Sequence, residues 1–136
     1  MSDVSPILSL GTASVAAAAT QTTDPITGQN GLSGLSGWVR FAGTGGSAVD
    51  VYLQTSPDQG ATWIDLCNAH FTAAGVSIFS LVQGAGANLA VTDGALASNT
   101  ALNSGAVPLF DEYRLKIVST GTWTNGLVSS FGMPRG

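Results

Sequence analysis

A predicted β-hairpin around residues 56–63 constrains the fold of this chain more than any other part of the sequence. Apolar and polar residues alternate over residues 49–54 and again over residues 63–67. A period of two is typical of strands that bury one face. Between the two runs, Asp58 is placed to accept backbone hydrogen bonds and Gly60 to adopt a positive φ. These features predict a tight turn between two antiparallel strands.

The turn contains the pattern Ser-x-Asp-x-Gly-x-Thr-Trp, formed by Ser56, Asp58, Gly60, Thr62 and Trp63. This pattern resembles the Asp-box hairpin of sialidase propellers and of several unrelated β folds. The resemblance implies a structural role, in which the Asp bonds to the turn and the Trp packs over it. A propeller enzyme would carry several copies, whereas this chain carries one. We therefore expect these residues to matter for folding and to take no part in a reaction.

Most of the remaining chain predicts further short strands. Residues 1–23 are expected to be an N-terminal arm or an edge strand, residues 31–37 an irregular loop, and Asn125-Gly126 a hairpin turn. Strands are expected at residues 38–42, 48–55, 62–71, 76–82, 113–118 and 127–133. Several short strands without a convincing helix indicate an all-β fold, an antiparallel β-sandwich or jelly roll, with residues 24–136 as a single domain.

Residues 83–107 predict a long irregular loop, because Gly, Ala, Ser and Asn dominate them. Loops of this length are uncommon in compact domains and tend to be functional or ordered by a partner.

The composition excludes several classes of protein. Only 9% of the residues are charged and the net charge is −4, with four scattered basic residues, so we expect no nucleic-acid partner. Cys67 is the single cysteine, which excludes an internal disulfide, and one Cys with one His makes no zinc site. We also expect no cofactor, no small-molecule substrate, no membrane span and no signal peptide, and hence synthesis in the cytoplasm.

The residues suited to catalysis do not form a predicted active site. His70 is the one imidazole, and its spacing from Cys67 places the two side chains on opposite faces of a strand. Asp111 and Glu112 are adjacent, and we expect them to cap a sheet and pair with Arg114. The chain is therefore not expected to be an enzyme. Its three Trp residues and Tyr52 are expected to close the ends of the sandwich, the alternative being a sugar-binding platform.

Two segments resemble small structural proteins of tailed-phage virions. They are residues 50–66, which include the turn, and residues 113–123, which read Tyr-Arg-Leu-Lys-Ile-Val-Ser-Thr-Gly-Thr-Trp. Gln59 stands where such proteins commonly have Gly, a departure with little consequence for the hairpin. The resemblance implies a β-sandwich component of the virion. Its expected function is capsid decoration (a cement protein), with a neck or tail component, or a carbohydrate-binding module, as the alternatives.

A cement protein binds the outside of a phage head and stabilises contacts between major capsid subunits. The low charge, the N-terminal arm and the long loop agree with that use. The expected partners are the major capsid protein and copies of this chain, as a dimer or trimer. Candidate contact residues, each of which has the core as its alternative place, are Ile7, Leu8 and Leu10 in the arm and Leu89 and Val91 in the loop.

Overall fold

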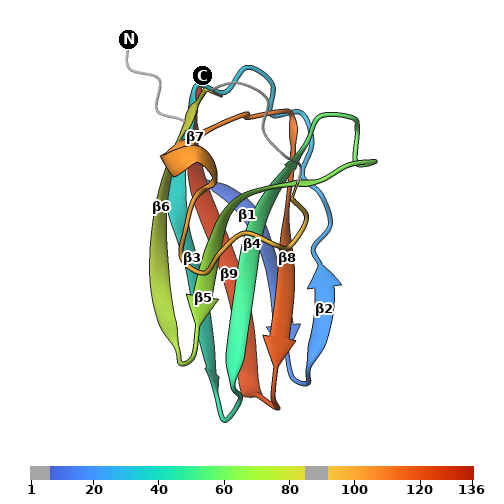
Figure 1. Cartoon of the computed structure of the whole chain (residues 1–136), viewed down its shortest axis with the longest axis vertical. Helices are drawn as coiled ribbons and strands as arrows, with labels where there is room; N and C mark the ends of the chain where they lie inside the picture. The colour runs from blue at the N-terminus through green and yellow to red at the C-terminus, as the bar shows by residue number, and fades with distance from the viewer. Residues whose placement is uncertain (1–6, 85–91) are drawn as a thin grey trace.

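The computed structural model, which describes residues 7–84 and 92–136, is a sandwich of two β-sheets (Figure 1). One sheet has the order β1-β9-β3-β6-β7 and the other β2-β8-β4-β5. The strands are β1 (Leu8–Val15), β2 (Ala19–Thr22), β3 (Gly34–Thr44), β4 (Ala48–Ser56), β5 (Ile64–Phe71), β6 (Gly75–Gln83), β7 (Ala106–Val107), β8 (Glu112–Thr120) and β9 (Thr124–Arg135). The predicted all-β sandwich is confirmed. Every strand pair is antiparallel except the short β6–β7 pair.

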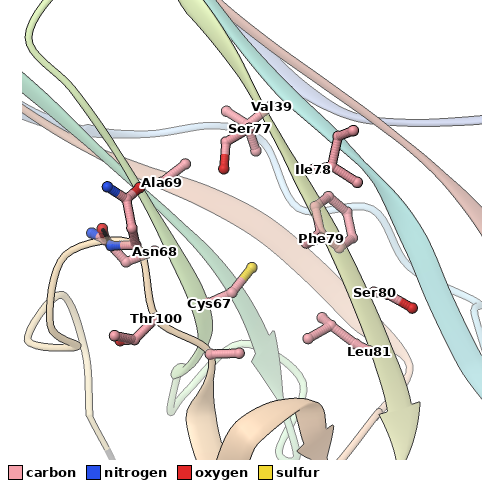
Figure 2. A pocket seen from close by; sticks show the side chains of 12 residues that line it. Val39, Cys67, Asn68, Ala69, Ser77, Ile78, Phe79, Ser80, Leu81 and Thr100 are labelled. Atoms are coloured by element: carbon pink, nitrogen blue, oxygen red, sulfur yellow. Dashed lines mark hydrogen bonds between the residues drawn. The ribbon is translucent and has the colours of Figure 1, made fainter.

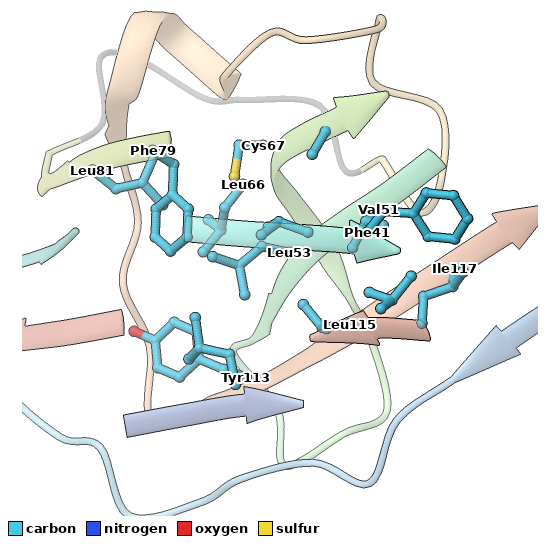
Figure 3. Packing of buried hydrophobic residues seen from close by; sticks show 14 of the residues in the cluster. Phe41, Val51, Leu53, Leu66, Cys67, Phe79, Leu81, Tyr113, Leu115 and Ile117 are labelled. Atoms are coloured by element: carbon cyan, nitrogen blue, oxygen red, sulfur yellow. The ribbon is translucent and has the colours of Figure 1, made fainter. Parts of the chain in front are cut away.

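The core lies between the two sheets, where inward side chains of both sheets meet (Figure 3). β8 shows the alternation from Tyr113 onward, because Tyr113, Leu115 and Ile117 are fully buried while Arg114, Lys116 and Val118 are partly exposed. The other sheet contributes Leu35, Phe41, Phe79 and Leu81, among others. Phe41 also contacts Trp123 edge to face, with ring centroids 4.8 Å apart. These contacts make one continuous hydrophobic core.

The N-terminal segment forms edge strands in both sheets. β1 pairs with β9 at the edge of the five-stranded sheet, and β2 pairs with β8 at the edge of the four-stranded sheet. Residues 1–23 were expected to form an arm or an edge strand, and the part that the structure describes, residues 7–23, contains these two edge strands. Leu10 on β1 is fully buried in the core.

The prediction of an irregular loop at residues 31–37 was wrong for its second half, because β3 begins at Gly34. Gly37 pairs with Gly132 of β9. A Cβ at Gly37 would collide with the backbone carbonyl of Phe131. The glycines that suggest a loop thus permit a close approach of two strands.

The prediction of a hairpin at Asn125-Gly126 was also wrong. β8 and β9 belong to different sheets, so residues 121–123 carry the chain across the sandwich. Asn125 and Gly126 lie inside β9. Gly126 pairs with Val15 of β1, and a Cβ there would strike the Val15 carbonyl.

The first part of the long loop after the undescribed residues, residues 92–101, is held in place by hydrogen bonds to β5 of the same chain. Residues 92–101 run along the outer edge of β5 and across the four-stranded sheet (Figure 1). The backbone N–H of Asp65 donates to Thr92 O (2.8 Å), and that of Asn68 donates to Thr100 O (2.9 Å). The segment then enters the short 3₁₀ turn η1 (Leu102–Gly105) and β7. Composition suggested ordering by a partner, whereas these residues protect the edge of β5.

Candidate interaction surface

The outer face of the five-stranded sheet carries a broad set of exposed apolar side chains, which we call the open face. The register across three strands places Phe131 (β9), Trp38 (β3) and Ile78 (β6) in one row. Above and below this row, the outward residues are Ile7, Ser36, Arg40, Val76, Ser80, Val82, Leu127, Ser129, Met133 and Arg135. The open face therefore extends across β1, β9, β3 and β6.

The exposed large hydrophobic residues of the described chain all lie on the open face. They are Ile7, Val76, Ile78, Val82, Leu127 and Met133. Ile78, in the central row, is 83% exposed. Isolated exposed apolar residues are normal, but a contiguous exposed group of this size on a monomer usually marks a binding surface.

Trp38 is the centre of the open face. Its ring lies 5.0 Å from the ring of Phe131, with the two planes inclined at 46°. The guanidinium carbon of Arg40 lies 5.1 Å from the Trp38 ring centroid. A hollow of about 70 Å³ beside the ring is lined by Ile7, Phe131 and Met133, among others. The centre thus combines aromatic rings, a fixed cation and a shallow depression, features common in protein interfaces.

The opposite outer face, on the four-stranded sheet, is covered by residues 92–101 through a buried carboxylate. Asp65 on β5 is completely inaccessible to solvent. Its two oxygens accept hydrogen bonds from the backbone N–H groups of Gly94, Ala95 and Leu96 at 2.9–3.2 Å. The Gln54 side-chain amide donates to the same carboxylate at 2.8 Å. Four donors therefore satisfy this buried charge and fix the segment to the sheet.

Further polar contacts extend this anchor toward β8. Asp93 accepts hydrogen bonds from Gln54 (2.7 Å) and Lys116 (3.1 Å) and lies 3.8 Å from Arg114. Partial burial works against ionisation of Asp93, but the Gln54, Lys116 and Arg114 contacts outweigh it and hold the pKa of the carboxyl below its usual value. Much of the four-stranded sheet's outer face is consequently occupied by its own chain, and the open face is the larger exposed apolar surface.

The predicted turn residues lie together between β4 and β5. Ser56 Oγ accepts from the Gly60 N–H (2.8 Å), and Asp58 Oδ1 accepts from the Thr62 N–H (2.7 Å). Trp63 is buried, and its indole N–H donates to the Gly60 carbonyl (3.0 Å). Gly60 has a φ of +93°. The geometry is that of a self-contained structural turn.

The sequence suggested that Arg114 pairs with Asp111 and Glu112, and this prediction was wrong. Its guanidinium stacks on Trp63, 4.3 Å from the ring centroid, and its Nε donates to Gln54 Oε1 (2.8 Å). These contacts direct the Arg114 guanidinium toward Asp93 rather than toward the start of β8.

His70 lies on the outer face of β5, away from Cys67. Its Nδ1 is 2.8 Å from Asp50 Oδ1, and its backbone N–H donates to Asn99 Oδ1. Within the described residues, no Ser, Thr or Cys side chain hydrogen-bonds to the imidazole. In the part of the chain that the structure describes, the His70–Asp50 pair therefore has no hydrogen-bonded nucleophile to activate.

Cys67 borders a cavity of about 180 Å³ between β5 and β6 (Figure 2). Val39, Phe79 and Leu81 form its apolar wall, and Thr100 is among the residues on its loop side. Burial, together with the nearby Asp65 charge, raises the pKa of the Cys67 thiol to about 12. A thiol so rarely ionised is a weak nucleophile near neutral pH.

The candidate contact residues of the N-terminal segment have different positions. Ile7 is 69% exposed on the open face, Leu8 is partly buried against the core, and Leu10 belongs to the core. The loop candidates Leu89 and Val91 lie outside the described residues.

The sequence does contain a signal for the open face. In β6, Val76 and Ile78 alternate with Phe79 and Leu81, so both sides of the strand are apolar. A strand with two apolar sides is expected to be covered on both. Sequence analysis predicted this strand at residues 76–82 but did not consider what covers its outer side.

Among the described residues, no group of three or more His, Cys, Asp or Glu side chains is arranged to hold a metal ion. In the same part of the chain, no helix has the length and hydropathy to cross a membrane. Comparisons with family models, curated proteins and solved structures found no match for this chain.

Proposed function

We propose that this protein is a structural, non-catalytic component of a phage virion that decorates the capsid exterior and stabilises contacts between major capsid subunits. The observation that carries the proposal is the open face, an exposed apolar sheet surface on a rigid sandwich. The resemblance of residues 50–66 and 113–123 to virion proteins supplies the biological setting.

The open face suits binding to a large, preformed surface. Its side chains stand on four hydrogen-bonded strands, so little conformational entropy is lost when a partner covers them. Complete burial of one large apolar side chain contributes about 1.5–3 kcal/mol. Several such residues suffice to offset the cost of association, which is on the order of 4–15 kcal/mol.

The alternative of a carbohydrate-binding module receives less support. Sugar rings stack on exposed, coplanar aromatic rings. Trp63 and Trp123 are buried, and the rings of Trp38 and Phe131 are inclined at 46° to each other. The open face is therefore better shaped for the side chains of another protein.

The copy number of this chain in purified phage particles tests the proposal. Quantitative mass spectrometry would give its ratio to the major capsid subunit. A ratio near one, or a simple fraction such as one third, is expected for a decoration protein. A ratio of a few hundredths would place the chain in the neck or tail, and its absence from particles would refute a role in the virion.

A further inference from the structure

Charge is distributed very unevenly between the two sheets. Within the described residues, the strands of the five-stranded sheet contain no Asp or Glu, and their two charged residues, Arg40 and Arg135, both lie on the open face. The described carboxylates belong to the other sheet or to loops: Asp24, Asp50, Asp58, Asp65, Asp93, Asp111 and Glu112. The net charge of the chain is −4, yet the charged side chains that the structure describes on this apolar face are both cationic.

The two arginines are available to a partner. Arg40 is exposed, and neither Arg40 nor Arg135 forms an ion pair with the part of the chain that the structure describes. Arg135 donates to the Ser36 hydroxyl at 3.3 Å, and Arg40 stacks over Trp38. Stacking holds the Arg40 guanidinium in place and leaves its N–H groups free for a carboxylate.

We propose that the partner of the open face is a protein surface with an apolar centre and carboxylates opposite Arg40 and Arg135, and not a second copy of this chain. The inference rests on the proposed function and specifies the chemistry of the surface that the open face contacts. Counting the residues that the structure describes, two open faces packed together would bring four arginines and no Asp or Glu side chain into one interface. Like charges brought together in this way oppose association, whereas carboxylates would neutralise them.

The dimensions of the face indicate how such a partner is arranged. Arg135 pairs with Gly34 of β3, six residues from Arg40 along the same strand. At about 3.3 Å per residue, the two arginines arise about 20 Å apart, with the Trp38 row between them. At about 4.8 Å per strand and 6.6 Å per outward row, four strands by five rows cover about 630 Å², before the height of the side chains is added. A standard interface buries about 800 Å² per partner, so the partner must cover nearly the whole face.

Rebinding to particles that lack this protein tests the inference. The wild type, Arg40→Gln and Arg135→Gln would be titrated onto particles from a phage deleted for the gene, at increasing NaCl concentrations. Thr27→Glu, in an exposed loop, changes the net charge by the same amount and is the matched control. Circular dichroism and light scattering of each free protein would verify its fold and its mass.

We expect each arginine variant to bind about tenfold or more weakly, with a smaller salt dependence, and Thr27→Glu to bind like the wild type. Equal binding of all four proteins would overturn the inference and leave the virion role intact. A wild-type dimer that Arg40→Gln strengthens would show that a second copy covers the face. Failure of the wild type to bind particles, together with its absence from natural ones, would refute both proposals.

Discussion

Replacement of Asp65 by Asn is expected to destabilise the fold and to release residues 92–101. In the native protein, Oδ2 accepts from the N–H groups of Gly94, Ala95 and Leu96, while Oδ1 accepts from Gln54 and Gly94. An Asn side chain has one oxygen and one NH₂ group. Whichever way the amide is oriented, its NH₂ group faces at least one of these donors.

The expected loss of unfolding free energy is estimated for the less costly of the two orientations of the introduced amide. With its oxygen toward the loop, Asn keeps the three backbone hydrogen bonds but loses their charge assistance, and its NH₂ group faces that of Gln54. Rotation of Gln54 gives no relief, because its Oε1 would then face Asp93 and lose Arg114. Hydrogen bonds to a charged group contribute about 1.5–3 kcal/mol and neutral ones about 0.5–1.5. We expect Asp65→Asn to lower the free energy of unfolding by about 2–4 kcal/mol.

Urea unfolding followed by Trp fluorescence would measure this loss, with Asp24→Asn as the control because Asp24 is exposed. Hydrogen exchange would show whether the amides of residues 94–96 lose protection before the rest of the sandwich. A change below about 0.5 kcal/mol, equal to that of the control, would refute the account of Asp65 as the anchor of this segment.

Three further predictions concern packing, ionisation and reactivity. Gly126→Ala should lower the free energy of unfolding by about 3 kcal/mol, because the new Cβ would strike the Val15 carbonyl. Thermal unfolding would measure the loss, with Gly136→Ala as the control. A loss as small as that of the control would contradict this prediction. Hydrogen bonds from Thr62 lower the pKa of Asp58 from 3.8, so Asp58 stabilises the fold above pH 3.8 and this contribution is lost as the pH falls through the lowered pKa. Stability measured against pH should therefore differ between the wild type and Asp58→Asn at pH 7 and converge in acid, whereas a gap independent of pH would be inconsistent with this role. Cys67, with its pKa near 12, should resist a thiol reagent at pH 8 until urea unfolds the chain, and rapid labelling of the native protein would show that the core opens readily.

The elements that were predictable from the sequence are those with local signals. The β4–β5 hairpin follows from its turn residues and the alternation on either side, and β8 follows from the buried positions Tyr113, Leu115 and Ile117. In both cases the pattern that marks the strand also selects the face that enters the core.

The errors arose where a residue's role depends on a distant segment. Gly37 and Gly126 read as loop and turn residues, but each permits close contact with a strand distant in sequence. Arg114 has acidic neighbours in the sequence, yet Trp63 and Gln54 direct it to Asp93. Such partners become known only when the strand order is known.

The open face and the Asp65 anchor were missed for related reasons. Asp65 lies in an alternating strand, where its polar side chain suggested a solvent-exposed position, and its coverage depends on residues 92–101. Trp38 was weighed as a residue closing an end of the sandwich or as part of a sugar platform, and its place in a row with Phe131 and Ile78 follows from pairings across three strands.

Oxidative footprinting of the protein, free and bound to phage particles, tests the central claim most directly. Hydroxyl radicals modify exposed Trp and Met side chains, and Trp38 and Met133 lie on the open face. Trp63 and Trp123, which are buried in the free protein, are internal references. The account predicts that modification of Trp38 and Met133 falls severalfold on the particle. Equal modification of both residues in the free and bound protein would show that the open face is not the binding surface.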